Sequence, residues 1–107
     1  MELRQLRYVE AVATHRHFTR AAAAIGVAQP ALSHQIKRLE QELGVQLLDR
    51  SRGGVRLTEA GETFLPRIRR ALSEIDAGRE EITALTGLQT GRVRLGAMQA
   101  LGALDLP

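Results

Sequence analysis

Apolar residues recur at helical spacing near the start of the chain, separated by polar and charged positions. The spacing predicts an amphipathic helix over about 2–15, whose inner face carries Leu3, Leu6, Val9 and Ala13. A second, shorter helix is expected over about 19–25, because Thr19 can cap a run of four alanines that Gly26 would end.

The third apolar pattern is the most regular in the chain. Pro30 suits the first turn of a helix, where its missing amide costs nothing, and Gly44 is a natural stop. We therefore predict a helix over 29–43. Its core stripe follows the spacing i, i+4, i+7 and i+11 and consists of Leu32, Ile36, Leu39 and Leu43.

The period changes after the third helix. Two short strand-like runs, 47–50 and 55–58, flank Gly53 and Gly54, and paired glycines supply the positive φ values that a tight hairpin needs. A two-stranded β ribbon over 47–58 is expected, with Arg52 at its tip.

A long helix over 59–87 follows, and Thr58 is placed to cap it. A heptad-like seam runs along it, and we expect this seam to form a dimer interface through Phe64, Leu65, Ile68, Leu72, Ile75 and Ile82. Packing of the seam onto the chain's own core is the alternative. Pro66 lies inside the helix and is expected to kink it or to leave the carbonyl of Glu62 unpaired.

The last residues change character again. Residues 87–91 look like a linker, and 92–96 resemble a strand without a partner in the remaining sequence. The expected organisation has three parts. A domain of three helices and a β ribbon spans 1–58, a linker helix spans 59–87, and a hinge with the start of a truncated second domain spans 88–107. We expect the sequence to be part of a longer protein.

Composition narrows the possible functions. The 107 residues carry 15 Lys or Arg and 12 Asp or Glu, a net charge of +3, and the positive charge is concentrated in residues 1–58. The chain has no cysteine, which excludes disulfides and thiolate metal sites, and no run approaches the about 20 apolar residues of a membrane span. No signal peptide is recognisable, so a soluble, cytoplasmic protein without a membrane partner is expected.

Catalytic and metal chemistry finds no support in the sequence. His15 and His17 lack neighbouring carboxylates or cysteines and are better explained as the end of the first helix, so no metal is expected. Ser33 and His34 are adjacent on a helix and do not face each other. The chain is therefore not expected to be an enzyme, and no catalytic residue is assigned.

The order helix, short helix, glycine turn, proline-started helix, ribbon and long helix describes a winged helix-turn-helix followed by a coiled-coil arm. The fold class is thus mainly α, with three helices, a two-stranded β wing and a long dimerisation or linker helix. Residues 3–65 resemble the N-terminal domain of LysR-type transcriptional regulators. The matching stretches include LRQLRY at 3–8, FTRAA at 18–22, QPALS at 29–33, QIKRLE at 35–40, LLDR at 47–50 and LTEAG at 57–61.

Two positions depart from the usual pattern of that family. Ala28 stands where Ser or Thr is common, which removes a hydroxyl cap from the third helix. His34 stands where arginine is common, so base preference at that position cannot be carried over.

The outer face of the third helix supplies the candidates for contacts with bases in a major groove, which admits one α-helix. They are Gln29, Pro30, Ser33, His34 and Lys37. Candidates for the DNA backbone or a minor groove lie on the wing, at the start of the second helix and at the edge of the third helix's outer face. They are Thr19, Arg20, Arg38, Arg50, Arg52 and Arg56. Arg4 and Gln5 are weaker candidates, and the alternative for the whole face is an ordinary solvated surface.

The resemblance implies a homodimer on an imperfect inverted repeat of double-stranded DNA, with antiparallel linker helices setting the spacing. It also implies that full-length relatives form tetramers and respond to a small inducer bound in the missing domain, with no cofactor in this part. Two other functions stay open: a nonspecific architectural DNA binder, and a protein-interaction adaptor that uses the coiled-coil helix.

Overall fold

The structure is a computed structural model that describes residues 1–51 and 53–97, with side chains described as far as residue 87. Its elements follow the expected order and are α1 (Leu3–His15), α2 (Phe18–Ile25), α3 (Gln29–Leu43), β1 (Leu48–Asp49), β2 (Arg56–Leu57) and α4 (Glu59–Ala97). The mainly helical fold class with a two-stranded wing and a long helix is confirmed. The chain divides into two compact units, Met1–Leu72 and Ser73–Pro107.

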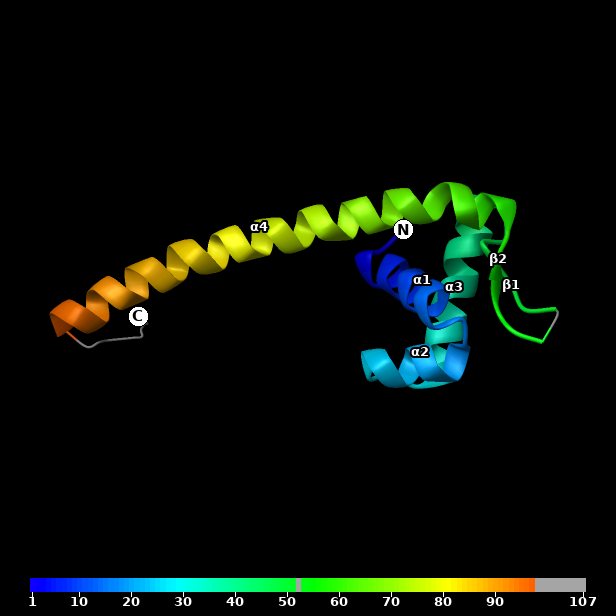
Figure 1. Cartoon of the computed structure of the whole chain (residues 1–107), viewed down its shortest axis with the longest axis horizontal. Helices are drawn as coiled ribbons and strands as arrows, with labels where there is room; N and C mark the ends of the chain where they lie inside the picture. Colours follow the sequence, from blue (N-terminus) through cyan, green and yellow to red (C-terminus); the bar gives the residue numbers. More distant parts are fainter. Residues whose placement is uncertain (52, 98–107) are drawn as a thin grey trace. The chain divides into compact units, whose positions relative to one another are not determined.

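The first unit holds the three short helices, the wing and the beginning of α4 (Figure 1). Helices α1, α2 and α3 contact one another pairwise. The wing is an antiparallel pair in which Leu48 lies opposite Leu57 and Asp49 opposite Arg56, and its loop extends away from the helices (Figure 1). The wing packs onto the unit through Leu48 and Val55, which belong to its hydrophobic core.

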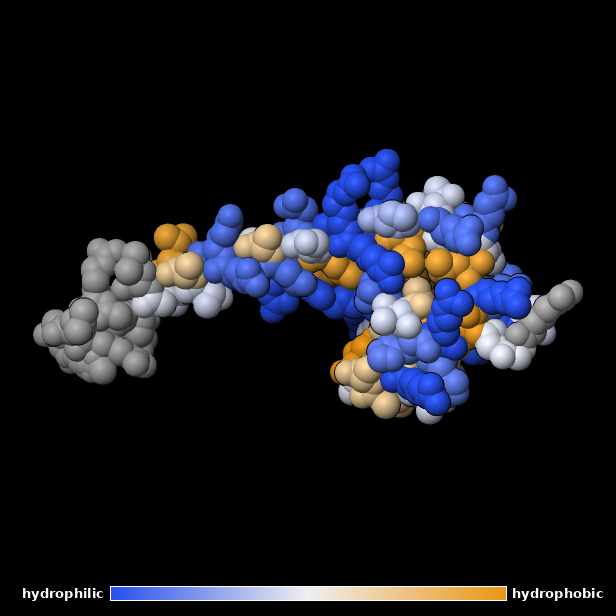
Figure 2. Space-filling view, viewed as in Figure 1, coloured by the Kyte–Doolittle hydropathy of each residue, from blue (hydrophilic) through white to orange (hydrophobic). Residues whose placement is uncertain are grey.

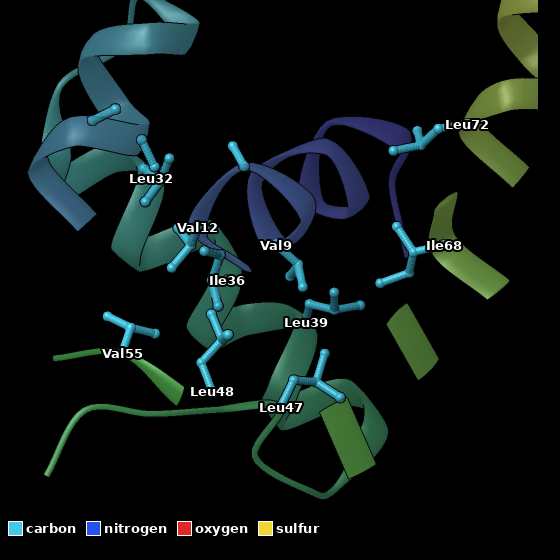
Figure 3. Packing of buried hydrophobic residues seen from close by; sticks show 13 residues of the cluster. Val9, Val12, Leu32, Ile36, Leu39, Leu47, Leu48, Val55, Ile68 and Leu72 are labelled. Carbon is cyan, nitrogen blue, oxygen red and sulfur yellow. The ribbon is translucent and has the colours of Figure 1, made fainter. Parts of the chain in front are cut away.

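One hydrophobic core holds this unit together (Figure 3). Each element sends aliphatic side chains into it, because the inner face of every helix is apolar at helical spacing. The most deeply buried of these side chains belong to Val9, Val12, Leu32, Leu39, Leu47 and Ile68. Leu43, expected in the core stripe of α3, is 37% exposed instead, because it is the last residue of the helix.

Helix α2 begins one residue earlier than expected, and its cap differs from the prediction. The N-cap is His17, whose Nδ1 accepts a hydrogen bond from the amide of Arg20 at 3.1 Å. Thr19 is already inside the helix, so its predicted capping role is wrong. Helix α3 begins after Ala28, which makes no side-chain capping bond, as the absent hydroxyl implied.

Thr58 and Gly61 join the wing to α4. The Thr58 hydroxyl accepts a hydrogen bond from the amide of Gly61 at 3.0 Å, which confirms Thr58 as the cap of α4. The backbone amide of Thr58 donates to the carbonyl of Leu47 at 3.0 Å. A Cβ atom on Gly61 would lie only 2.1 Å from the carbonyl oxygen of Leu47. Only glycine therefore lets α4 begin this close to the start of the wing.

Helix α4 differs from the expectation at its far end. It continues to Ala97 and passes through Pro66 and the glycines at 87 and 91, so the predicted linker and the strand over 92–96 are wrong. A helix satisfies its backbone groups within its own segment, whereas a strand requires a partner. The rest of the segment 88–107, expected to hold a hinge and the start of a second domain, lies outside the described residues from residue 98 onward.

The apolar seam of α4 is divided at Leu72. Leu65, Ile68 and Leu72 are 6%, 1% and 8% exposed within the chain itself, so their assignment to a dimer interface is wrong. Phe64 is half-buried against the same core. These side chains are buried within the chain because the first turns of α4 pack onto the helices of the first unit.

We predict that Gly61→Ala lowers the free energy of unfolding by about 1–3 kcal/mol, because the added methyl group must displace the Leu47 backbone. Urea denaturation followed by circular dichroism measures the change. Gly78→Ala is the matched control, since Gly78 also lies inside α4 but a Cβ there meets nothing within 4 Å. Equal stability of the two variants would contradict the close-approach argument.

Candidate nucleic-acid interface

One side of α3 is exposed because the other side is buried. Leu32, Ile36 and Leu39 are 0–3% exposed and fix the rotation of the helix about its axis. On the opposite side the side chains of His34 and Lys37 are exposed. His34 and Lys37 therefore reach the surface instead of the interior, and the wing does not cover them.

The first turns of α3 contain a local hydrogen bond between two of the candidates. The Gln29 Nε2 donates to the Ser33 Oγ at 2.7 Å, one helical turn away, and both side chains are half-buried. This bond occupies one N–H of the Gln29 amide and leaves its other N–H and its carbonyl oxygen. Pro30, between them in the first turn, is exposed.

A groove lies between the exposed side of α3 and the wing. The start of α2 also lines it, through Phe18. The residues that line it from α3 and from the wing include Ser33, His34, Lys37, Asp49, Arg50 and Ser51. Pro30 lines it as well, so four of the five predicted base-contacting residues and one predicted wing residue share a single concave surface.

The remaining cationic candidates are spread around this surface. Thr19 and Arg20 lie exposed in the first turn of α2, and the start of a helix attracts anions. Arg38 is exposed on α3. Arg56 is exposed on β2 and borders a different depression, shared with Arg16 and Glu62. Arg52 lies outside the described residues.

Arg50 makes a contact that the sequence did not indicate. Its guanidinium carbon lies over the ring of Phe18, 4.1 Å from the ring centroid. This is within the about 6 Å range of a cation–π interaction. The contact joins the wing to the first residue of α2.

Glu40 is the main functional residue that sequence reasoning missed. Its Oε2 accepts the amides of Leu47 and Leu48 at 2.8 and 3.1 Å, so the carboxylate holds the start of the wing against α3. A glutamate on an amphipathic helix looks like a solvated residue. Only a fold in which the chain turns back onto the helix after Gly44 brings those amides within reach.

Gln5 also has a role that differs from the expectation. It is 5% exposed, and its Nε2 donates to the Oε1 of Gln35 on α3 at 3.1 Å. Its Oε1 accepts the amide of Glu2 at 2.9 Å. Gln5 thus links α1 to α3 inside the unit, and its weaker candidacy for contact with DNA is wrong.

The distal part of α4 presents the other candidate surface. Ile75, Ile82 and Leu85 are 44%, 64% and 66% exposed and follow one another at heptad-like spacing. Ile75 and Ile82 belong to the predicted dimer seam, and Leu85 extends it. Figure 2 shows how the hydrophobic residues on the visible face of the molecule are interspersed with hydrophilic ones.

Two further findings concern the described residues alone. None of their helices combines the length and the hydropathy required to cross a membrane. No group of three or more His, Asp or Glu side chains among them is arranged to hold a metal ion.

The fold and its exposed recognition-type helix define a winged helix-turn-helix domain that continues into a long helix. Comparison with known families identifies it further. The family described as "Bacterial regulatory helix-turn-helix protein, lysR family" matches residues 3–62, so the chain belongs to the LysR family.

Relatives in sequence are transcriptional regulators. The chain is 50% identical over 96 residues to the HTH-type transcriptional regulator BudR of Klebsiella aerogenes, covering 90% of the chain and 67% of that protein. It is 39% identical over all 107 residues to the DNA-binding transcriptional dual regulator OxyR of Escherichia coli, covering 35% of that protein. The chain thus spans only about a third of the length of OxyR and of several other relatives.

Solved structures with the same fold include two complexes with DNA. The BenM DBD in its catB site 1 DNA complex is 42% identical, with a TM-score of 0.76, and the alignment covers 79% of this chain and 96% of that one. The CbnR DBD in its DNA complex is 41% identical, with a TM-score of 0.72, and the alignment covers 79% and 98%.

We predict that Glu40→Ala lowers the free energy of unfolding by about 1–3 kcal/mol, because the Leu47 and Leu48 amides lose their acceptor. Chemical denaturation measures the loss. Glu42→Ala is the matched control on the same helix: its carboxylate is exposed and, among the described residues, pairs only with the amino group of Met1, so the substitution should cost less than about 1 kcal/mol. A larger loss for Glu42→Ala would refute the assignment.

Proposed function

We propose that the chain binds double-stranded DNA in a sequence-specific manner, as the DNA-binding part of a LysR-type transcriptional regulator. Helix α3 lies in the major groove in this proposal. The observation that carries it is the exposed polar side of α3, held outward by a fully buried apolar side and bordered by cations. Similarity to the BenM and CbnR DBDs, both solved with DNA, supports it.

In this proposal, residues in the first half of α3 contact the bases directly. Gln29 retains one N–H and its carbonyl oxygen, the pair of groups that recognises adenine in the major groove. Lys37 can donate to guanine, and His34 can donate or accept. Ser33 orients the Gln29 amide and contributes its hydroxyl, while Pro30 supplies an apolar contact.

Contacts to the DNA backbone hold the helix in its groove. Thr19 and Arg20 bind a phosphate at the start of α2 in this proposal, because helix N-termini and arginines both favour anions. Arg38, Arg50 and Arg56 add cationic contacts. The wing over 47–58, including Arg52, lies along the backbone or enters the minor groove.

The functional form we propose is a homodimer. Exposed Ile75 and Ile82 pack against a second copy of α4, and this pairing places two α3 helices on an imperfect inverted repeat. By analogy with the family, the full-length protein acts in the cytoplasm, forms tetramers and responds to a small inducer bound outside residues 1–97.

Selection of bound duplexes from a random 30-base-pair library tests the proposed specificity. The expected result is one enriched, imperfectly symmetric site, bound at least about a thousandfold more tightly than mixed-sequence DNA. A ratio near one would mean a nonspecific architectural binder. Failure to retard any duplex at low salt would indicate a protein-interaction adaptor and would overturn the proposal.

We predict that Gln29→Ala weakens binding to the selected duplex by about 1–3 kcal/mol and leaves binding to a mixed-sequence duplex unchanged. Arg20→Ala is the comparison: it should weaken binding to both duplexes alike and reduce the salt slope by about one. Fluorescence anisotropy titrations at several salt concentrations measure both. Equal losses on the two duplexes for Gln29→Ala would show that Gln29 does not read a base.

We predict that Ile82→Lys weakens the dimer at least about tenfold, because each copy loses an apolar contact and gains a charge in the seam. Analytical ultracentrifugation over a range of protein concentrations measures the association. Ala84→Lys, an equal change of charge at an exposed position off the seam, should leave the dimer intact. Unchanged association of Ile82→Lys would exclude the seam as the interface.

A further inference from the structure

The groove between α3 and the wing contains a pair of residues that the base-reading proposal does not use. Phe18, the first residue of α2, lies on one side of it, and Arg50, directly after β1, lies on the other. Their side chains meet, with the guanidinium carbon 4.1 Å from the centre of the ring. We propose that Phe18 is a positioning residue that holds Arg50 in place to bind a DNA phosphate at the mouth of this groove; this inference rests on the proposed function.

The Phe18 ring is a fixed platform. It is half-buried and packs against the hydrophobic core of the first unit. The first turn of α2, to which it belongs, is held by the bond from the Arg20 amide to His17. An aromatic ring anchored on a core loses little freedom when a cation lies on its face, so the contact with Arg50 requires no rearrangement.

The backbone on both sides of Arg50 is also fixed. Asp49, immediately before it, lies opposite Arg56 in the backbone register of the two strands. The Asp49 Oδ1 accepts the amide and the hydroxyl of Ser51, immediately after it, at 2.9 and 2.7 Å. The stem of Arg50 therefore leaves the wing in a defined direction, and the ring of Phe18 determines where its head group lies.

The guanidinium retains its hydrogen-bonding capacity in this position. No hydrogen bond or ion pair uses it among the residues that the structure describes, and its side chain is exposed. A contact through the ring face leaves the N–H groups, and these match the oxygen atoms of a phosphate. Lys37 lines the same groove and adds positive charge, while the nearby Asp49 carboxylate is already engaged by Ser51.

A double-mutant cycle tests the proposal, with binding to the selected duplex and to a mixed-sequence duplex measured by anisotropy. We expect Phe18→Leu to weaken binding to both duplexes about two- to fivefold, the size of an exposed cation–π contact. The same change in an Arg50→Ala background should have no further effect. Phe18→Tyr, which keeps the ring, should bind like the wild-type chain.

Two controls separate positioning from folding and from general loss of charge. Urea denaturation shows whether Phe18→Leu is folded under the binding conditions. In an Arg38→Ala background, where the lost cation is exposed on α3 and does not line the groove, Phe18→Leu should keep its full effect. Only a dependence on Arg50 supports the proposal.

Several outcomes would overturn it. Equal losses for Phe18→Leu with and without Arg50 would mean that the ring acts through the core alone. Weaker binding of Arg50→Ala with an unchanged Phe18→Leu would leave the proposed DNA-binding function standing and remove the role of Phe18. Failure of the wild-type chain to bind either duplex would instead refute the proposed function itself.

Discussion

The burial of one side of α3 is the constraint on which the rest of the structure depends. Leu32 and Leu39 have no exposed area and Ile36 has 3%. Burial of each such side chain is worth about 1.5–3 kcal/mol, so rotation of the helix would be opposed by several kcal/mol. The side that carries His34 and Lys37 takes no part in this packing and is free to serve a ligand.

The same helix also fixes the position of the wing. Glu40 lies one residue after Leu39 on α3, and its carboxylate holds the two amides at which the wing begins. Leu47 then enters the core, and the close approach of Gly61 returns the chain to the same place at the start of α4. The wing is therefore held in a fixed position relative to α3, although its sheet consists of only two short strands.

Local pattern was sufficient for the elements but not for their long-range partners. The spacing of Leu32, Ile36 and Leu39 and the paired glycines of the wing predicted α3 and the hairpin, because helices and tight turns follow from neighbouring residues. The roles of Glu40 and Phe18 depend on groups 7 to 32 positions away. The strand predicted over 92–96 was wrong for a related reason: a β-like composition does not supply the partner that a strand requires.

The seam of α4 shows most clearly what periodicity can and cannot decide. The same residue types at the same spacing are buried in the chain's own core up to Leu72 and are exposed from Ile75 onward. Periodicity identifies an apolar face but not the surface that covers it. A row of large aliphatic residues in water is unfavourable unless something covers it, so the exposed half calls for a partner that the buried half does not need. In the proposed homodimer, one continuous helix therefore has two separate tasks: its first turns stabilise the domain, and its distal part pairs with the second copy.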